Sequence, residues 1–294
     1  MHENLPIDRS SFSRLLLVLT LLAVPPSCAQ AVPASTSSMS LQTAGAANGS
    51  ATFDAAAEAQ LVALINEARA QHGLSQLTVE PRLTEAARKH AQLMAEHGAL
   101  SHQFETEAPI EKRFAAEDLA SDREGENVDL DHTVASVHAG LMDSPPHRHN
   151  ILNAEYNVVG VGVIRHGPYL FVTEDFAHRL PRYSEPETEE LVRNAVEQYE
   201  RSHGFSAPQR KPQPQLRRIA CDLALSDTLE AHNAAQLPEV RAVFAWTAGD
   251  PGKLPPGSDR ILSQGLPAGY ALGACFAPSV SHPGGVYWIV MVSY

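Results

Sequence analysis

The sequence is poor in cysteine, in aromatic residues and in clustered positive charge. Of its 294 residues, three are cysteines and 6% are aromatic. The 22 lysines and arginines are outnumbered by 34 acidic residues, which gives a net charge of -12, and the basic residues form no run beyond adjacent pairs. Nucleic acids and anionic membranes are bound by concentrated positive charge. The sequence therefore argues against either of them as the main partner.

A hydrophobic run long enough to cross a membrane is also missing at the N-terminus. The apolar run LLLVLTLLAV, at 15–24, is shorter than the about 20 residues that a membrane-spanning helix needs. It follows two arginines and precedes the small residues of PPSCAQA, a pattern that predicts a secretory signal peptide over 1–31. Residues 32–53 are mostly Ala, Ser, Thr and Gly, so we expect a disordered linker there.

The three cysteines divide between the signal peptide and the rest of the chain. Cys28 could be the lipidated residue of a lipoprotein, although Pro25 and Pro26 stand where such signals usually carry small or aliphatic residues. We expect a secreted or extracytoplasmic protein, attached to a membrane only if Cys28 is lipidated. Cys221 and Cys275 then remain as a pair, which an oxidising compartment favours as a disulfide; two buried small hydrophobic residues are the alternative.

With 44% hydrophobic residues the chain can form sizeable cores, and its periodicity predicts where the elements lie. Apolar residues spaced three and four apart predict helices at 54–73, at 81–98 and at 133–142. Two alternating segments, 158–165 and 169–175, flank the turn His-Gly-Pro and predict a β-hairpin.

Three short motifs carry the candidate chemistry. The stretch SPPHRHNIL, from residue 144, has two prolines that suit the first turn of a short helix, which places His147 at a helix N-terminus. The helix dipole there disfavours imidazolium and leaves a neutral ring. The other two motifs are LSHQF at 100–104 and GENV at 125–128.

In this order, framed by two helices before and by the strand VVGVGV after, these motifs resemble one family. The chain is similar to the CAP superfamily, the cysteine-rich secretory, antigen 5 and pathogenesis-related-1 proteins, in its bacterial form. The resemblance covers about residues 54–176. It implies an α+β fold, a three-layer α-β-α sandwich, with a cleft that carries over onto His102, Glu126 and His147.

The resemblance implies two interpretations of the cleft. Two histidines and one carboxylate, with water in the fourth place, make an open divalent-metal pattern, so His102 and His147 are candidate ligands of zinc and Glu126 is a candidate general base. The same residues could also satisfy one another as an inert polar cluster. A second glutamate found in family members aligns with Ser144, next to Asp143, so both are counted with the cleft.

Three further residues of the motifs are expected to be structural. Asn127 is expected to hold the GEN turn, Arg148 to anchor its loop through carbonyls or a carboxylate, and Asn150 to support the short helix. No serine or cysteine nucleophile is indicated.

The second half of the chain echoes the first. After a charged connector at 179–189, ELVRNAVEQYERSHGFS echoes AQLVALINEARAQHGLS. We therefore predict that a CAP domain at 54–178 is followed by a smaller, degenerate copy at 190–294, in which the disulfide Cys221–Cys275 ties the second helix to the hairpin. Chance similarity between amphipathic helices is the alternative. The copy lacks all three motifs, which favours a structural or interaction role.

These observations predict a secreted CAP-domain binding or interaction module whose cleft takes a divalent metal or a small extracellular or cell-envelope ligand. Two alternatives stay open at this point. One is a metal-assisted hydrolase acting on peptide or cell-envelope material, and the other is an inert structural scaffold.

Overall fold

The computed structural model describes residues 51–263, 265–266 and 269–294. The predicted signal peptide, with Cys28, and most of the predicted linker lie outside these residues. The last linker residues are not irregular, because Thr52–Phe53 forms the short strand β1. Within the described ranges, no helix combines the length and the apolar content that a membrane crossing requires.

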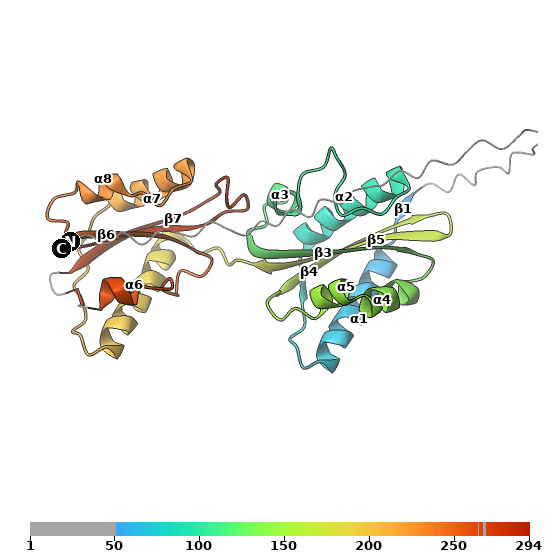
Figure 1. The fold of residues 1–294 in the computed structure, drawn as a ribbon, viewed down its shortest axis with the longest axis horizontal. Helices are drawn as coiled ribbons and strands as arrows, with labels where there is room; N and C mark the ends of the chain where they lie inside the picture. The colour runs from blue at the N-terminus through green and yellow to red at the C-terminus, as the bar shows by residue number, and fades with distance from the viewer. Residues whose placement is uncertain (1–50, 264, 267–268) are drawn as a thin grey trace, which may run out of the picture. The chain divides into compact units, whose positions relative to one another are not determined.

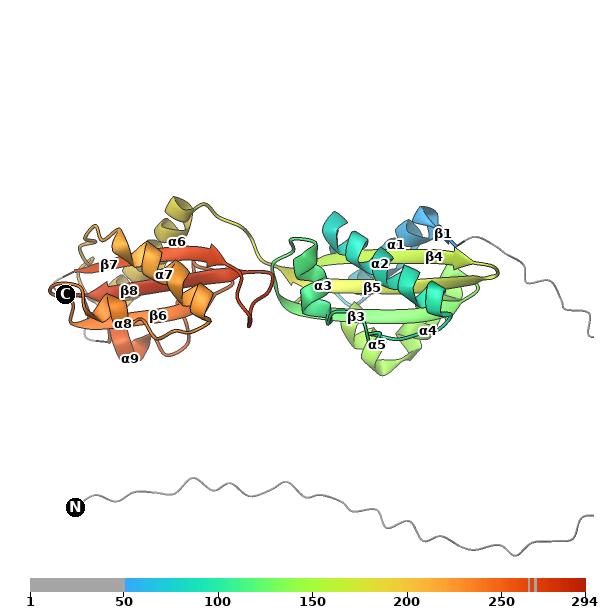
Figure 2. The ribbon, with the colours of Figure 1, turned by 90° about the horizontal axis from the view of Figure 1, so that it is seen from above.

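The first half of the described chain is the predicted three-layer α-β-α sandwich (Figure 1, Figure 2). Its sheet is built on an antiparallel hairpin of two strands, with a third long strand at the edge and two short strands on the other side. The strands are β4 (Val158–His166), β5 (Tyr169–Arg179), the edge strand β3 (Ser121–Asp131), β1 and β2 (Thr78–Val79). One face carries α2 (Pro81–His97) and α3 (Ile110–Ala116), and the other carries α1 (Ala55–Gln71), α4 (Val134–Asp143) and α5 (Pro145–Ile151).

Local signals set the ends of the predicted helices, and the three long ones are confirmed. The Asp54 carboxylate accepts a hydrogen bond from the Ala57 backbone N–H at 3.0 Å and so begins α1. Pro81 opens α2, and Gly98 ends it in the left-handed conformation, at φ 62°. The double proline likewise opens α5, so His147 lies in the first turn of a helix.

Two glycines let α2 approach the sheet. A Cβ atom on Gly160 would lie 2.2 Å from the backbone carbon of Leu83, and one on Gly162 would lie 2.4 Å from that of Ala87. No side chain fits at these distances, so the glycine spacing of β4 is required by the helix above it. The close approach brings the next turn of α2, with His90, down onto the sheet.

The sequence did not predict α3 or β3. Six of the eleven residues of β3 are charged, which hides the alternation of a strand. The motif GENV lies in the middle of this strand, so the expected GEN turn is wrong. Asn127 holds an extended segment rather than a turn.

The second half of the described chain contains another sandwich. Its antiparallel sheet has the order β6-β8-β7, which matches the order β3-β5-β4 of the first sheet. Helix α6 begins at Glu185, before the predicted domain start at 190, because Ser184 and Glu187 form a capping box. The elements are α6 (Glu185–Ser202), α7 (Gln215–Ser226), α8 (His232–Ala235), β6 (Ala242–Ala248), α9 (Asp259–Leu262), β7 (Tyr270–Ala277) and β8 (Val286–Ser293).

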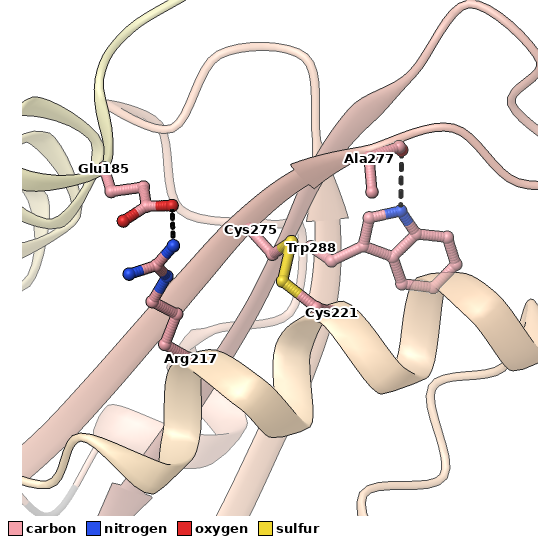
Figure 3. The surroundings of a disulfide bond; sticks show 6 residues. All are labelled: Glu185, Arg217, Cys221, Cys275, Ala277 and Trp288. Carbon is pink, nitrogen blue, oxygen red and sulfur yellow. Dashed lines mark hydrogen bonds and ion pairs between the residues drawn. A yellow bond between two sulfur atoms is a disulfide. The ribbon is translucent and has the colours of Figure 1, made fainter.

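A disulfide joins the second helix of this half to its hairpin, as predicted. Cys221 on α7 is bonded to Cys275 on β7, with Cα atoms 5.3 Å apart (Figure 3). The bond lies next to the ion pair of Arg217 with Glu185, which links α7 to α6. The matching sheet order and this linkage support the interpretation of a degenerate copy, which stays a prediction.

We predict that Gly162→Ala destabilises the protein by about 2 kcal/mol, since the new methyl group overpacks the α2 backbone. Gly140→Ala is the matched control, because its Cβ would meet nothing closer than 3.7 Å within α4 and a helical alanine stabilises by up to about 1 kcal/mol. Urea unfolding of both variants measures the difference. Equal stability of the two variants would contradict the close approach.

Candidate functional site

The candidate site is built around the edge strand β3. Successive side chains of a strand point to opposite faces, so Glu126 and Asn127 serve the two sides of the sheet. Glu126 contacts residues that lie on α3 and in the loop after α2, whereas Asn127 contacts α5 and β5. His102 and His147 thus belong to opposite faces and meet at the edge strand.

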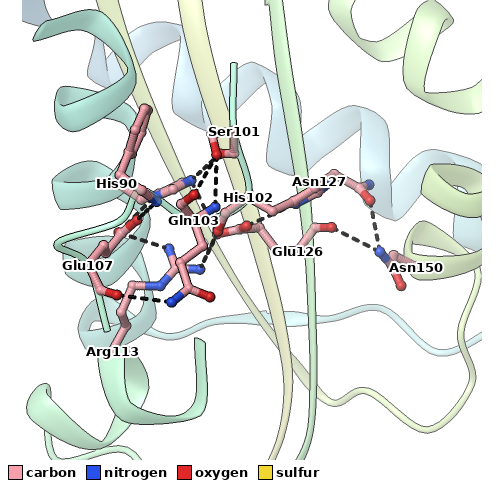
Figure 4. Close-up of polar contacts among 10 residues, drawn as sticks. His90, Ser101, His102, Gln103, Glu107, Arg113, Glu126, Asn127 and Asn150 are labelled. Atoms are coloured by element: carbon pink, nitrogen blue, oxygen red, sulfur yellow. Dashed lines mark hydrogen bonds and ion pairs between the residues drawn. The ribbon is translucent and has the colours of Figure 1, made fainter. Parts of the chain in front are cut away.

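Glu126 is buried and both of its carboxylate oxygens are engaged (Figure 4). His102 donates from Nδ1 to Oε1 at 3.0 Å, and Arg113 donates from Nη2 to Oε2 at 2.7 Å. Burial raises the pKa of Glu126, but the hydrogen bond from His102 and the charge of Arg113 outweigh it and hold that pKa below its usual value. Glu126 is therefore a fixed carboxylate.

Next to Glu126 lies a polar network of His90, Glu107 and Arg113 (Figure 4). The Nη1 atom of Arg113 lies 3.5 Å from Glu107, whose other neighbour is His90 Nδ1 at 2.7 Å. His90 is fully buried, and its Nε2 faces the Ser101 carbonyl at 2.8 Å. Both ring nitrogens of His90 thus face oxygen acceptors, and Arg113 brings its positive charge to the carboxylates of both Glu107 and Glu126.

A further carboxyl group, that of Asp175, lies next to Glu126 on the neighbouring strand β5. Asp175 is its cross-strand partner on β5 and is fully buried, and within the described residues neither of its oxygens has a hydrogen-bond partner. Burial, followed by the charge of Glu126, raises the pKa of Asp175 well above its usual value. Burial and the neighbouring Glu126 carboxylate thus both favour the protonated form of Asp175.

On the other face of β3, Asn127 and Asn150 bind the backbone of the site. Asn127 donates from Nδ2 to the His147 carbonyl at 3.2 Å and to Glu174 at 3.1 Å. Asn150 donates to the Glu126 carbonyl at 3.1 Å and to Asn127 Oδ1 at 2.9 Å. These bonds join α5 to β3, so both asparagines position the histidine-bearing helix against the strand.

The two histidine rings lie near each other but differ in state. Their centroids are 6.4 Å apart. The hydrogen bond with Glu126 raises the pKa of His102, whose side chain is 60% exposed. Burial, together with the charge of His102, lowers the pKa of His147, and the charge of Asp129 opposes this. The site thus places a ring that favours protonation beside one that favours the neutral form.

Arg148 does not anchor α5 as expected. The guanidinium of Arg148 bonds to His72 Nε2 at 3.0 Å on the surface, rather than to a carbonyl or a carboxylate. The buried Arg69 of α1 anchors the end of α5 instead. Its Nη1 donates to the carbonyls of Ile151 at 2.9 Å and Asn153 at 2.8 Å, just where α5 ends.

Asp143 and Ser144 were expected to lie in the cleft with His102, Glu126 and His147, but the structure does not place them there. Asp143 is exposed and lines a small cavity of about 370 Å³ together with His149 and Arg148. Ser144 ends α4 and begins α5, and its side chain makes no capping hydrogen bond. The acidic residue whose charge acts on His147 is Asp129 on β3.

The residues present do not fit a three-ligand metal centre. Within the part of the chain that the structure describes, no group of three or more His, Cys, Asp or Glu side chains is arranged to hold a metal ion. Glu126, the carboxylate expected beside His102 and His147, is turned to Arg113. A metal could therefore draw only on the two imidazoles.

Sequence reasoning missed the buried residues on which this site depends. His90 lies on α2, Arg113 lies on α3, and Glu107 lies in the segment between these helices. None of the three belongs to a motif that the sequence analysis singled out. Glu174 and Asp175 carried a usable signal, since they are two adjacent acids at the end of a segment that was predicted as a strand of the β-hairpin.

Comparison with known proteins gives a consistent result. Residues 62–176 match the model of CAP, the cysteine-rich secretory protein family. Two Bacillus subtilis proteins, described as the uncharacterized membrane protein YlbC and the uncharacterized protein YkwD, are each 30% identical to this chain, over 124 and 111 residues. These stretches cover 42% and 37% of this chain and 34% and 43% of the relatives, so the chain spans less than half of either relative's length.

Among solved structures, an extracellular protein with an SCP domain from Bacillus anthracis is 26% identical, with a TM-score of 0.39. The match covers 42% of this chain and 41% of that one. A cysteine-rich secretory protein from Staphylococcus aureus is 20% identical, with a TM-score of 0.36, and the match covers 42% and 39% of the two chains.

We predict that Arg113→Met costs about 3 kcal/mol of stability, because it leaves the buried carboxylates of Glu126 and Glu107 without their guanidinium. Arg123→Met is the matched control, since its ion pair with Glu155 is more than half exposed on both sides and is worth less than about 1 kcal/mol. Thermal and urea unfolding compare the two variants. A loss below 1 kcal/mol for Arg113→Met would contradict this pairing.

We also predict a pH-dependent gain in stability from Glu174→Gln. Burial raises the pKa of Glu174 to about 7 from its ordinary 4.5. The folded state therefore keeps a proton that the unfolded state loses, and the wild type loses stability as the pH rises from 4.5 through 7, by about 3 kcal/mol in all. The variant should match the wild type near pH 4 and exceed it at pH 8. Exposed Glu105→Gln should show no such trend in urea titrations, and a flat difference for Glu174→Gln would refute the burial argument.

Proposed function

Because residues 62–176 form a CAP domain, we propose that the chain works outside the cytoplasm as a binding module, with a cleft at His102 and His147 that recognises a small ligand. The predicted signal peptide supports the location, and so does the disulfide of the second half, since disulfides persist in oxidising compartments. The name of the family, cysteine-rich secretory proteins, is in keeping with this.

One observation carries the choice of binding over hydrolysis. Glu126 would have to be the general base, yet one of its oxygens accepts from Arg113 and the other accepts from His102. A base that activates water works best with a pKa near the working pH. Glu126 has its pKa held low and instead orients the imidazole of His102.

The arrangement resembles the outer support that carboxylates give to functional histidines. With Nδ1 bound to Glu126, the ring of His102 presents Nε2 as its remaining polar atom. A ring that favours protonation donates from that atom, so the ligand group that suits it is an oxygen acceptor such as a carboxylate or a carbonyl. His147, as a neutral ring, can donate or accept beside it. Peptide and cell-envelope fragments carry such groups.

The test is binding to two probes, zinc chloride and soluble peptidoglycan fragments, by the chain without its predicted leader (residues 32–294). Chemical shifts of the imidazole nitrogens are followed for the wild type and for His102→Ala, His147→Ala and His149→Ala. His149 is the matched control, because it lies on the same helix but lines the separate cavity of Asp143.

The fragments should shift the resonances of both His102 and His147, with an affinity at least tenfold weaker in either alanine variant and unchanged in His149→Ala. Zinc that binds one-to-one and more tightly than the fragments would replace this proposal with a two-histidine metal site. A response to neither probe would favour the inert scaffold.

A further inference from the structure

The two sheets treat their exposed edges differently. The free edge of the first sheet is β3, in which six of eleven residues are charged. The corresponding edge of the second sheet is β6, Ala-Val-Phe-Ala-Trp-Thr-Ala, which has no charged residue, proline or glycine. Natural proteins commonly protect edge strands with charge, because unpaired backbone N–H and C=O groups attract another strand. Strand β6 lacks that protection.

Strand β6 is also open to pairing. It bonds to β8 along one side, and within the described residues it pairs with no other strand and makes no other backbone hydrogen bond. Six of its seven residues are only partly buried, whereas seven of the eight residues of the neighbouring β8 are buried. Phe244 and Val243 each pack against one of the two hydrophobic cores of this half, on opposite faces of the sheet, and both remain only partly buried.

The sequence of β6 is close to a palindrome. Read from either end it gives alanine, a β-branched residue, an aromatic residue and then the central Ala245. An antiparallel pair of two such strands, related by a two-fold axis at Ala245, places like against like at every position. We propose that β6 pairs antiparallel with β6 of a second copy of this chain, which joins two three-stranded sheets into one sheet of six strands.

The cross-strand neighbours of this pair fit each other. Phe244 would lie opposite Trp246 of the partner subunit, twice by symmetry, and aromatic cross-strand pairs stabilise antiparallel sheets. Val243 would lie opposite Thr247 of the partner subunit, and small Ala245 would meet its own copy at the axis. At the ends, Arg241 would lie opposite Gly249 of the partner subunit and next to Asp250 of the partner subunit, a residue that pairs with Lys253 within its own chain. Such an interface is isologous, the commonest arrangement in homodimers.

The first measurement is the mass of residues 32–294 by sedimentation equilibrium. We expect twice the mass of one chain for the wild type, and the mass of one chain for Ala245→Lys, which places two ammonium groups opposite each other at the axis. Leu225→Lys is the matched control and should remain dimeric, because Leu225 is 86% exposed on α7 of the same half. A monomeric wild type, or a dimer that Ala245→Lys leaves intact, would overturn the proposal.

A cysteine trap tests the register even if Ala245→Lys fails to fold. Ala245→Cys introduces little volume and places two thiols on facing strands at the two-fold axis, so oxidation should cross-link it to a dimer on a non-reducing gel. Thr247→Cys alone should not cross-link, but it should do so when mixed with Val243→Cys. Equal cross-linking of Ala245→Cys and Thr247→Cys would show that the copies meet in some other register and would overturn the proposed pairing.

Discussion

The candidate site depends on the contact between the Arg113 guanidinium and the Glu126 carboxylate. A buried carboxylate is costly unless it is paired and hydrogen-bonded. Arg113 supplies that pairing at 2.7 Å, and the same side chain lies beside Glu107, which in turn holds the buried His90. The orientation of His102 follows from a carboxylate that cannot move. Asp175, the cross-strand neighbour of Glu126, has its pKa raised by burial and by the charge of Glu126.

The second helix of each half packs closely on its sheet, but the contacts that hold it there differ between the two halves. In the first half, α2 approaches β4 at Leu83 over Gly160, and the next approach is at Arg88 over Gly162. In the second half, α7 approaches β7 in the same manner at Leu216 over Gly273. Five residues further along α7 and two further along β7 lie Cys221 and Cys275. The disulfide therefore takes the place that a second glycine contact has in the first half.

The two halves also use their corresponding edges differently. In the first half, the edge strand is charged and carries Glu126 and Asn127 between the two histidines of the candidate site. In the second half, the cleft motifs are absent and the edge strand is uncharged and self-complementary. The pairing proposed for β6 would bring two candidate sites into one assembly, and two linked sites bind a repetitive target more tightly than one. The two halves would then divide recognition and assembly between them.

The sequence predicted the elements whose signals are local. Helix caps at Asp54 and Gly98, the hairpin after Asn157 and the double-proline start of α5 were all recognisable. Motif likeness grouped His102, Glu126 and His147, and the structure places His102 in contact with Glu126 and its ring 6.4 Å from that of His147. It did not predict β3, because the charges of an edge strand conceal its alternation, nor the partners of Glu126. Arg113 lies in a charged segment that resembles a surface helix, whereas His90 lies on the apolar face of α2 but its polar partners come from distant segments. Alignment placed Ser144 at the position of a second acid, with Asp143 next to it, whereas the acid whose charge acts on His147 in the structure is Asp129 of β3.

The most direct test of the central claim is the protonation pattern of His102, measured by long-range nitrogen–proton correlation spectroscopy on the imidazole ring. If Glu126, fixed by Arg113, orients that ring, then His102 carries a proton on Nδ1 in the wild type, and the folded Glu126→Gln variant loses that preference. An unprotonated Nδ1 in the wild type, or an imidazole signal that does not respond to Glu126→Gln, would contradict the account.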